Sequence, residues 1–197
     1  FKVKFSLSGL HFSDDFKKYF STYKVLDFDF EKPLGKNSFQ QSKETYNIST
    51  AFNIIEHMEY PNKLLDNINY FTKKDGFLLL TTDNISTIKN MLRMLIGGKS
   101  PNESLIKSKI FYSGEWRPHV RIFSKDELTF LLNYSGFRLI EHNYFNLRAR
   151  EYQLNDKELI RNRRSLKRRV LEFIEYLCPF YRDHQIIVAQ KVVEYDD

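Results

Sequence analysis

The sequence predicts an α/β fold, in which helices cover a sheet. Runs typical of β-strands alternate with segments of helical period along the chain of 197 residues, and this alternation is characteristic of such a sheet. The run GFLLLTT, from Gly76, is continuously apolar, as strands buried on both faces require. Gly and Pro are scarce, at 7 and 5 residues, which favours long regular elements. The length suits one domain over residues 1–197.

The N-terminal part predicts three strands and two helices before that apolar run. The strands are expected at FKVKFSL (1–7), YKVLDFDF (23–30) and YNISTAFNII (46–55). The first helix follows Ser13, an N-cap residue type, and the second begins near Pro61, which suits a first helical turn. The second helix carries an apolar stripe of Leu64, Leu65, Ile68 and Phe71. Asp75-Gly76 then predicts a turn.

The C-terminal part predicts a helix, a long connection and further regular elements. A helix from about Ser86 has the stripe Ile88, Met91, Leu92 and Leu95, and Gly97-Gly98 closes it. Residues 99–123 lack a clear period and are expected to form an excursion, or lid, over the sheet edge. Ser124 and Glu127 form a capping-box pattern for a helix that ends at Gly136. The last elements are expected to be a strand at 137–145, a helix at 156–177 and a strand at 184–193.

Positive charge is concentrated in one segment. Residues 148–169 hold nine Lys or Arg against three acids, a surplus equal to the net charge of +6 for the chain. This segment belongs to a predicted basic amphipathic helical insertion, 148–177, before the last strand. Such a run suggests nucleic acid or an anionic membrane surface. Its apolar residues Leu159, Leu166, Val170, Ile174 and Leu177 recur at helical spacing, which favours a helix docked on the sheet with a basic outer face.

Composition also limits the compartment and the chemistry. Cys178 is the only cysteine, so no disulfide within the chain is possible and a reducing compartment fits best. No stretch approaches the roughly 18 apolar residues that a membrane span needs, and no leader precedes Phe1. A cytoplasmic protein is therefore expected. No Cys/His cluster has the spacing of metal ligands, so no metal is expected.

Several motifs resemble those of class I S-adenosylmethionine-dependent methyltransferases. The central motifs are Asn53-Ile-Ile-Glu56-His57, Pro61, Lys73-Lys-Asp-Gly76 and Thr81-Thr-Asp-Asn84. A later signature is His119-Val-Arg121-Ile-Phe-Ser124, followed by Gly136-Phe137. The nearest resemblance is to methionine-biosynthesis W and ubiquinone O-methyltransferase proteins. It implies a Rossmann-like, doubly wound, seven-stranded sheet with helices on both sides, mostly parallel with a reversed last strand, and S-adenosylmethionine as cofactor.

The resemblance also implies where the cofactor binds. The family carries an acid and a glycine-rich turn after the first strand, whereas this chain has one glycine there and Lys4 in place of the acid. Asp27 and Asp29 stand where a strand-end acid accepts hydrogen bonds from ribose hydroxyls. The expected cofactor-binding residues are Ser6, Ser8, Gly9, Asp27, Asp29, Phe30, Phe52 and Asn53.

Candidate catalytic residues follow from the chemistry of methyl transfer. If the acceptor is a hydroxyl, His57 or His119 could take its proton, and His119 with Arg121 could hold an acidic or phosphorylated acceptor. Alternatively, His57 caps the next helix or bonds a loop, and His119 and Arg121 lie on a solvated lid. Glu56 is expected to be structural.

The expected function is methyl transfer to a small-molecule or sugar-like acceptor. One alternative is a catalytically impaired methyltransferase-like domain that binds or regulates a partner, which the altered glycine turn favours. Another is a nucleic-acid methyltransferase steered by the basic helix, although the run lacks the interleaved aromatic residues that single-strand binders use. The sequence does not indicate an oligomeric state.

Overall fold

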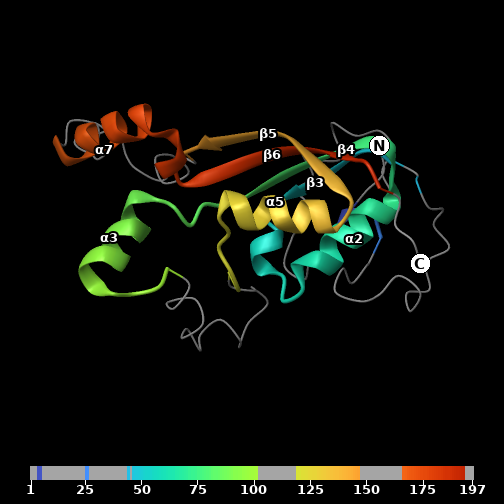
Figure 1. Ribbon diagram of the computed structural model, residues 1–197, viewed down its shortest axis with the longest axis horizontal. Helices are drawn as coiled ribbons and strands as arrows, with labels where there is room; N and C mark the ends of the chain where they lie inside the picture. Colours follow the sequence, from blue (N-terminus) through green and yellow to red (C-terminus); the bar gives the residue numbers. More distant parts are fainter. Residues whose placement is uncertain are drawn as a thin grey trace.

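The computed structural model describes residues 4–5, 25–26, 44, 46–101, 119–146 and 166–193. Their main sheet has four strands in the order β3-β4-β6-β5 (Figure 1). These strands are β3 (Tyr46–Phe52), β4 (Thr72–Asp83), β5 (Phe137–Phe145) and β6 (His184–Lys191). β3 runs parallel to β4, whereas β6 runs antiparallel to both β4 and β5. The expected α/β class and the reversed last strand are confirmed.

Two short strands form a second sheet. β1 (Lys4–Phe5) pairs in parallel with β2 (Val25–Leu26), within the first two segments predicted to be strands. The helix predicted after Ser13 and most of the excursion 99–123 lie outside the described residues.

Two helices pack on one face of the main sheet. They are α2 (Pro61–Phe71) and α5 (Lys125–Tyr134), and they lie next to each other under the strands in Figure 1. Beyond one end of the sheet lie α3 (Ile88–Gly97) and α7 (Leu166–Leu177). Two 3-10 turns complete the regular structure, η2 (Ile55–His57) and η5 (Pro179–Tyr181). None of the described helices is long and apolar enough to cross a membrane.

The core lies between α2, α5 and the sheet. It includes Leu64, Leu65, Ile68, Leu78, Leu80, Phe123, Leu128, Leu132, Phe137, Ile187 and Ala189, all of them buried. Burying each large apolar side chain stabilises the fold by about 1.5–3 kcal/mol. The face of α2 predicted from Leu64, Leu65 and Ile68 is therefore confirmed, with Phe71 partly buried.

Several local signals act as the sequence predicts. Pro61 opens α2, where its missing N–H costs nothing. The capping box of α5 is complete, because the Glu127 N–H donates to Ser124 Oγ at 3.2 Å and the Ser124 N–H donates to Glu127 Oε2 at 2.8 Å. Gly98 ends α3 in the left-handed region, with φ 57°.

Two boundaries differ from the predictions. The strand expected over 46–55 ends at Phe52, because Asn53 adopts φ 50° and the chain turns into η2. Asp75-Gly76 does not end the preceding element in a free turn but lies inside β4. The pairing passes directly from Tyr46–Thr72 to Ile48–Phe77, so the extra residues of β4 form a bulge, and Asp75 adopts φ 61° there.

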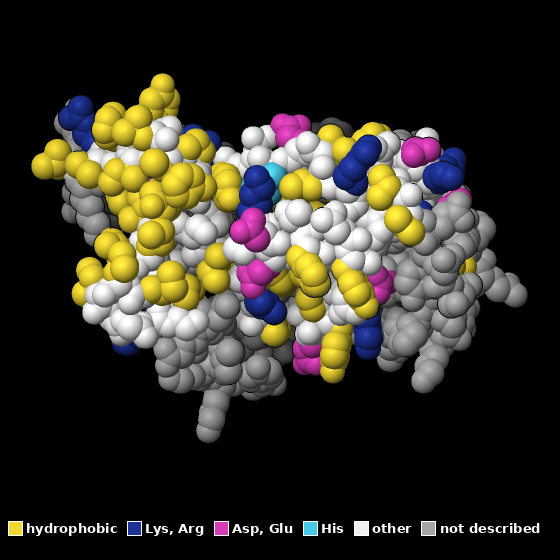
Figure 2. Space-filling view, viewed as in Figure 1, with side chains coloured by type: hydrophobic (Ala, Val, Ile, Leu, Met, Phe, Trp, Pro, Cys, Tyr) yellow, Lys and Arg dark blue, Asp and Glu magenta, His cyan; other side chains and the backbone are white. Residues whose placement is uncertain are grey.

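Two predicted apolar stripes are partly exposed, including that of the helix expected to dock on the sheet. Leu92 and Leu95 of α3 lie at the surface, and so do Leu166, Val170 and Leu177 of α7. Figure 2 shows the hydrophobic side chains gathered at the end of the molecule that α3 and α7 form. The part of the predicted helix 156–177 that the structure describes packs against η5, beyond the sheet, and this is why its stripe is not covered by the strands.

Replacing Gly136 by alanine is expected to destabilise the fold more than the same change at Gly98. Both glycines have positive φ, 76° and 57°, so each alanine incurs about 1–2 kcal/mol of backbone strain. Only at Gly136 would the new Cβ collide with neighbours, at 2.8 Å from Asn69 Nδ2 and 2.9 Å from the Val193 carbonyl, whereas the space at Gly98 is open. Urea unfolding should show a total loss of about 2–4 kcal/mol for Gly136→Ala. Equal losses for the two variants would contradict this packing argument.

Candidate functional site

The candidate site lies where the parallel strands β3 and β4 end. Open α/β sheets bind ligands at the carboxyl ends of their strands. Asn53 leaves β3 with its N–H bonded to the Thr81 carbonyl at 2.9 Å, and Thr81 Oγ1 donates to Asn53 Oδ1 at 2.9 Å. These two bonds hold the end of β3 against β4, and η2 follows directly.

Glu56, in η2, is a buried acid with one unsatisfied oxygen. Its side chain is 1% exposed, because Ile55 and Met58 on either side insert into the core. Thr82 Oγ1 donates to Glu56 Oε2 at 2.9 Å, whereas Oε1 has no hydrogen-bond partner. Burial raises the pKa of Glu56. An unpaired buried carboxylate oxygen is costly, so this position calls for a specific explanation.

The Glu56 turn also holds a distant segment in place. The Glu56 carbonyl accepts hydrogen bonds from the Val120 N–H at 2.7 Å and the Arg121 N–H at 3.2 Å. His119, the preceding residue, is thereby brought to His57, and the ring centroids are 4.7 Å apart in an edge-to-face arrangement.

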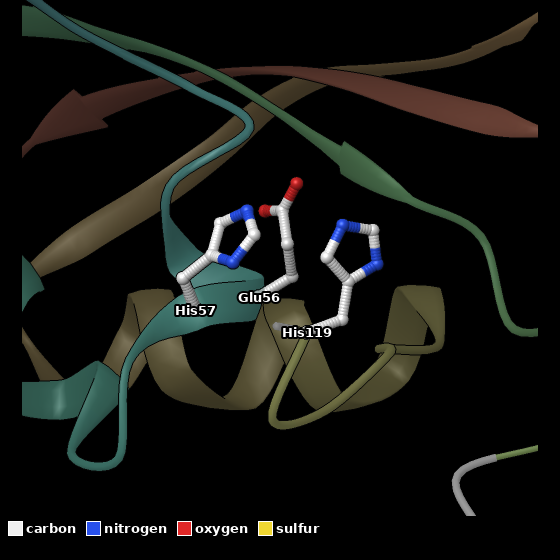
Figure 3. A group of neighbouring side chains, drawn as sticks. All are labelled: Glu56, His57 and His119. Carbon is white, nitrogen blue, oxygen red and sulfur yellow. The ribbon is translucent and has the colours of Figure 1, made fainter. Parts of the chain in front are cut away.

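Glu56, His57 and His119 form one group, the Glu–His–His cluster. Each offers one ligand atom, and these atoms all lie within 4.8 Å of one another. Figure 3 shows the Glu56 carboxylate between the two imidazole rings. The cluster combines the residue types that accept protons and those that bind metals.

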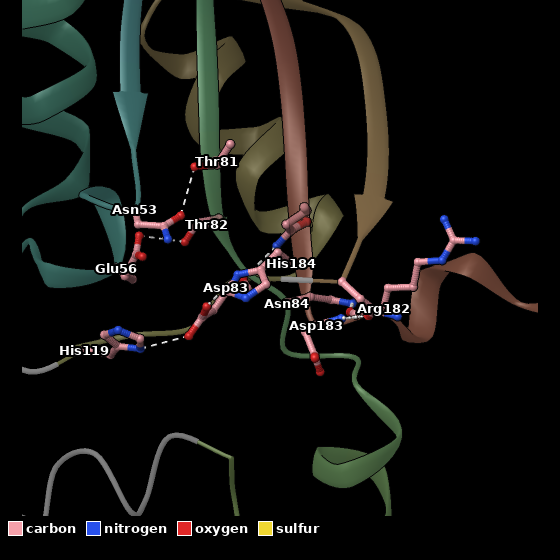
Figure 4. Close-up of polar contacts among 12 residues, drawn as sticks. Asn53, Glu56, Thr81, Thr82, Asp83, Asn84, His119, Arg182, Asp183 and His184 are labelled. Carbon is pink, nitrogen blue, oxygen red and sulfur yellow. Dashed lines mark hydrogen bonds and ion pairs between the residues drawn. The ribbon is translucent and has the colours of Figure 1, made fainter. Parts of the chain in front are cut away.

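Asp83 orients one ring of the cluster. Its Oδ2 lies 2.9 Å from His119 Nδ1, and its Oδ1 lies 2.9 Å from His184 Nδ1 (Figure 4). Burial alone would raise the pKa of Asp83, but its close contacts with the two histidine rings outweigh it and hold this pKa well below its usual range. The hydrogen bond that His119 donates to Asp83 raises the pKa of His119.

These shifts predict how Asp83→Asn affects stability at different pH. Because folding lowers the pKa of Asp83, the ionised carboxylate stabilises the fold above about pH 4. Because folding raises the pKa of His119, the protonated ring stabilises the fold below about pH 6.5, and this contribution is lost as the pH rises through the folded pKa of His119. The cost of Asp83→Asn should therefore be largest near pH 5–6, at about 1–2 kcal/mol for these partly exposed groups, and smaller at pH 9. Urea unfolding in chelator-treated buffer tests this, and a cost that grows toward pH 9 would contradict it.

Gln185, at the start of β6, ties the site to the sheet. Its Nε2 donates to the Phe123 carbonyl at 2.8 Å and to the Asp83 carbonyl at 3.1 Å, and its Oε1 lies 2.9 Å from His142 Nε2. Phe123 is fully buried and its segment forms a β-bridge with Asn84. The segment that carries His119 is thus anchored four residues further along.

The structure brings together only some of the predicted site residues. His57 and His119 meet, whereas the Arg121 guanidinium forms an ion pair with Glu127 and lies over the Phe123 ring at 5.6 Å. Arg121 therefore faces the start of α5, away from the cluster. Phe52 and Asn53 are exposed at the strand ends. The remaining predicted cofactor residues lie outside the described residues: Ser6, Ser8, Gly9, Asp27, Asp29 and Phe30.

Three residues of the site were not among the sequence-based candidates. Glu56 was expected to be structural, and Asp83 and His184 were not singled out as site residues. A signal existed for the last two, because Asp83 ends one strand and His184 begins another. In an antiparallel pair of strands these ends meet, and Asp83 is indeed paired with His184.

Two of the eight expected cofactor residues, Phe52 and Asn53, lie in the described part of the chain. Both are exposed where β3 ends, and Asn53 adopts φ 50° there. An accessible aromatic ring and a side-chain amide at strand ends can contact an adenosine group by stacking and hydrogen bonding.

Comparisons with known proteins agree with this geometry. The sequence pattern of the family described as "Methyltransferase domain" matches residues 8–142, more than half of the chain. No curated protein matches the sequence significantly.

Solved structures share the fold at low sequence identity. An S-adenosylmethionine-dependent methyltransferase from Archaeoglobus fulgidus is 16% identical, with TM-score 0.51, over 96% of this chain and 75% of its own. One from Methanosarcina mazei is 13% identical, with TM-score 0.52, over 88% and 69%. The [4+2]-cyclase SpnF is 14% identical, with TM-score 0.53, over 91% of this chain, which spans 61% of the cyclase. The fold alone therefore does not specify the reaction.

Proposed function

The chain belongs to the family of methyltransferase domains, with S-adenosylmethionine as the cofactor, and from that premise we propose that it methylates a hydroxyl group of a small-molecule or sugar-like acceptor. The observation that carries the proposal is the Glu–His–His cluster beside the end of β3. It places proton-accepting side chains next to the edge at which the cofactor is expected.

The donor side of the proposed site is the end of β3, where Phe52 and Asn53 are exposed. When bound, S-adenosylmethionine supplies an electrophilic methyl group, which leaves sulfur as the acceptor oxygen forms its bond to carbon, and the S–C electron pair stays on sulfur. Phe52 and Asn53 would hold the adenosine end of the cofactor. Much of the acceleration in such a reaction comes from positioning, so few residues need to act chemically.

The acceptor side is the Glu–His–His cluster. His57 and His119 are half-buried, so their rings are within reach of a bound acceptor. A hydroxyl placed between them would give its proton to this cluster as the new C–O bond forms. Arg121 is left out of this role, because its ion pair with Glu127 directs it to α5.

The first test separates donor binding from acceptor chemistry. Isothermal titration of the purified chain with S-adenosylmethionine should give 1:1 binding, and Asn53→Ala should weaken it about tenfold, the loss of one net hydrogen bond. Thr129→Ala, at an exposed position of α5, should leave the affinity unchanged. Absence of binding would refute the proposal and favour a methyltransferase-like domain that has lost catalysis.

The second test concerns the acceptor. Hydroxylated metabolites and sugars should be screened for release of S-adenosylhomocysteine. With an active acceptor in hand, His57→Ala and His119→Ala should each lower kcat by about 100-fold or more, the usual contribution of an acid-base group. Unchanged kcat in both variants would remove the cluster from the reaction.

A further inference from the structure

The Glu–His–His cluster contains a feature that proton transfer does not require. Glu56 Oε1 is buried and has no hydrogen-bond partner, although the side chain is 1% exposed and its other oxygen accepts from Thr82. The backbone of η2 is held in place, because Ile55 lies in the core and the Glu56 carbonyl accepts from the Val120 and Arg121 N–H groups. The Glu56 carboxylate lies between the two imidazole rings (Figure 3).

The geometry suits one ion. Ligand atoms bound to a single cation at about 2.0–2.2 Å lie roughly 3–4 Å apart. The three ligand atoms here are all within 4.8 Å of one another, so side-chain adjustments of about 1 Å or less would bring them onto one ion. No backbone movement is needed, since η2 and the 119–121 segment are already joined by hydrogen bonds.

The surroundings of His119 are those of a metal ligand. Its Nδ1 lies 2.9 Å from the Asp83 carboxylate, so coordination would use the other ring nitrogen, Nε2. Metal-binding histidines usually donate their other ring N–H to a carboxylate, which fixes the tautomer and the ring orientation. Asp83 is itself held by His184 at 2.9 Å, so the orienting carboxylate has a defined position (Figure 4).

We propose that Glu56, His57 and His119 bind a divalent first-row transition-metal cation such as Zn²⁺ or Mn²⁺, with Asp83 as the positioning residue for His119. Two imidazoles and one carboxylate suit these ions, whereas Mg²⁺ and Ca²⁺ prefer oxygen ligands alone. The Glu56 and Asp83 carboxylates balance the charge of the cation. Three protein ligands leave at least one coordination position open, as in catalytic rather than structural sites.

The role of the cation rests on the proposed function, but its binding does not. A cation held by these three residues would lower the pKa of an acceptor hydroxyl bound at its open position, so that the proton would pass to water. With the cation bound, this route would take the place of proton uptake by His57 or His119, which would then serve as ligands. Because binding can be measured without donor or acceptor, failure of the cation site and failure of methyl transfer are separate results.

The test is cation binding by the whole chain after removal of metals with EDTA. Titration with ZnCl₂ and MnCl₂ should give one site per chain, and Co²⁺ should produce the visible absorption bands of a site with nitrogen and oxygen ligands. Glu56→Gln keeps the side-chain shape and an acceptor for Thr82 but removes the charge. It should weaken binding by more than the roughly 10- to 100-fold expected for Asp83→Asn, which removes only the orienting carboxylate.

Matched controls identify the site. Glu59→Gln changes an exposed acid three residues away and should bind as the unchanged chain does. Circular dichroism and thermal unfolding in EDTA show whether each variant is folded. In EDTA, Glu56→Gln should be at least as stable as the unchanged chain, because it removes a buried charge. With Zn²⁺ added, it should lack the stabilisation that the cation confers on the unchanged chain. No binding by the unchanged chain, or equal binding by Glu56→Gln and Glu59→Gln, would overturn the proposal.

Discussion

Replacing Lys191 by alanine is expected to lower the free energy of unfolding by about 3–5 kcal/mol, the usual cost of breaking a buried charged network. Lys191 ends β6 and is 0% exposed. Its Nζ donates to Glu44 Oε1 at 3.0 Å, the Asn69 carbonyl at 3.0 Å and the Thr72 carbonyl at 2.9 Å. The three bonds use all the protons of the ammonium group and join β6 to the end of α2 and the start of β4.

Lys191→Met separates the charge from the packing. Methionine fills most of the space of the lysine stem but leaves the Asn69 and Thr72 carbonyls without this donor. We expect a loss of about 1–3 kcal/mol from these groups, smaller than for alanine. Urea unfolding of both variants measures this, with Lys74→Ala at an exposed position of β4 as the control. A methionine variant at least as stable as the unchanged chain would show that desolvation of the ammonium outweighs its three bonds.

Phe123→Ala is expected to cost about 3–5 kcal/mol and to disturb the site as well. Phe123 is fully buried, and truncating a core phenylalanine removes transfer free energy and leaves a cavity. Its carbonyl accepts from Gln185 Nε2 at 2.8 Å and from the Ile85 N–H at 3.2 Å. The substitution keeps this carbonyl but removes the ring that fixes it in the core, and the same segment carries His119, so the variant should also weaken Zn²⁺ binding at the proposed site.

Phe130→Ala is the control for Phe123→Ala, because it truncates a nearby phenylalanine that lies at the surface. Phe130, on α5, is 69% exposed, and Phe130→Ala should change stability by about 0.5 kcal/mol or less. Urea unfolding and Zn²⁺ titration should be measured on both variants. Equal stability losses for the two phenylalanines would contradict the assigned core. Unchanged Zn²⁺ affinity in a folded Phe123→Ala chain would show that His119 is held without this anchor.

Much of the fold was predictable because its signals are local. The strand expected at 137–145 has these bounds in the structure, and the capping box at Ser124 and Glu127 starts α5 as predicted. Pro61 and the glycines at 98 and 136 mark helix ends for the same reason. Each of these signals depends on backbone conformation within a few residues, so neighbours along the chain are sufficient to specify it.

Predictions failed where a contact elsewhere decides the outcome. The apolar stripes of α3 and α7 have helical spacing, but spacing does not determine whether a sheet covers them, and Leu95 and Leu166 are exposed. The bulge at Asp75-Gly76 depends on how β4 pairs with β3. Gln185 and Lys191 share the inward face of β6 with Ile187 and Ala189. Ile186 and Val188 on the other face are apolar as well, so the sequence did not indicate that the two polar residues are buried.

By itself the sequence determined the α/β class, the order of the elements and the resemblance to methyltransferases, because periodicity, caps and short motifs are properties of neighbouring residues. Only the tertiary structure decided that Glu56 is buried with an unpaired oxygen and that His119 joins His57. These residues meet because the Val120 and Arg121 N–H groups bond the Glu56 carbonyl across a long stretch of chain. Such a contact depends on the packing of the whole sheet and its helices, which no local pattern encodes.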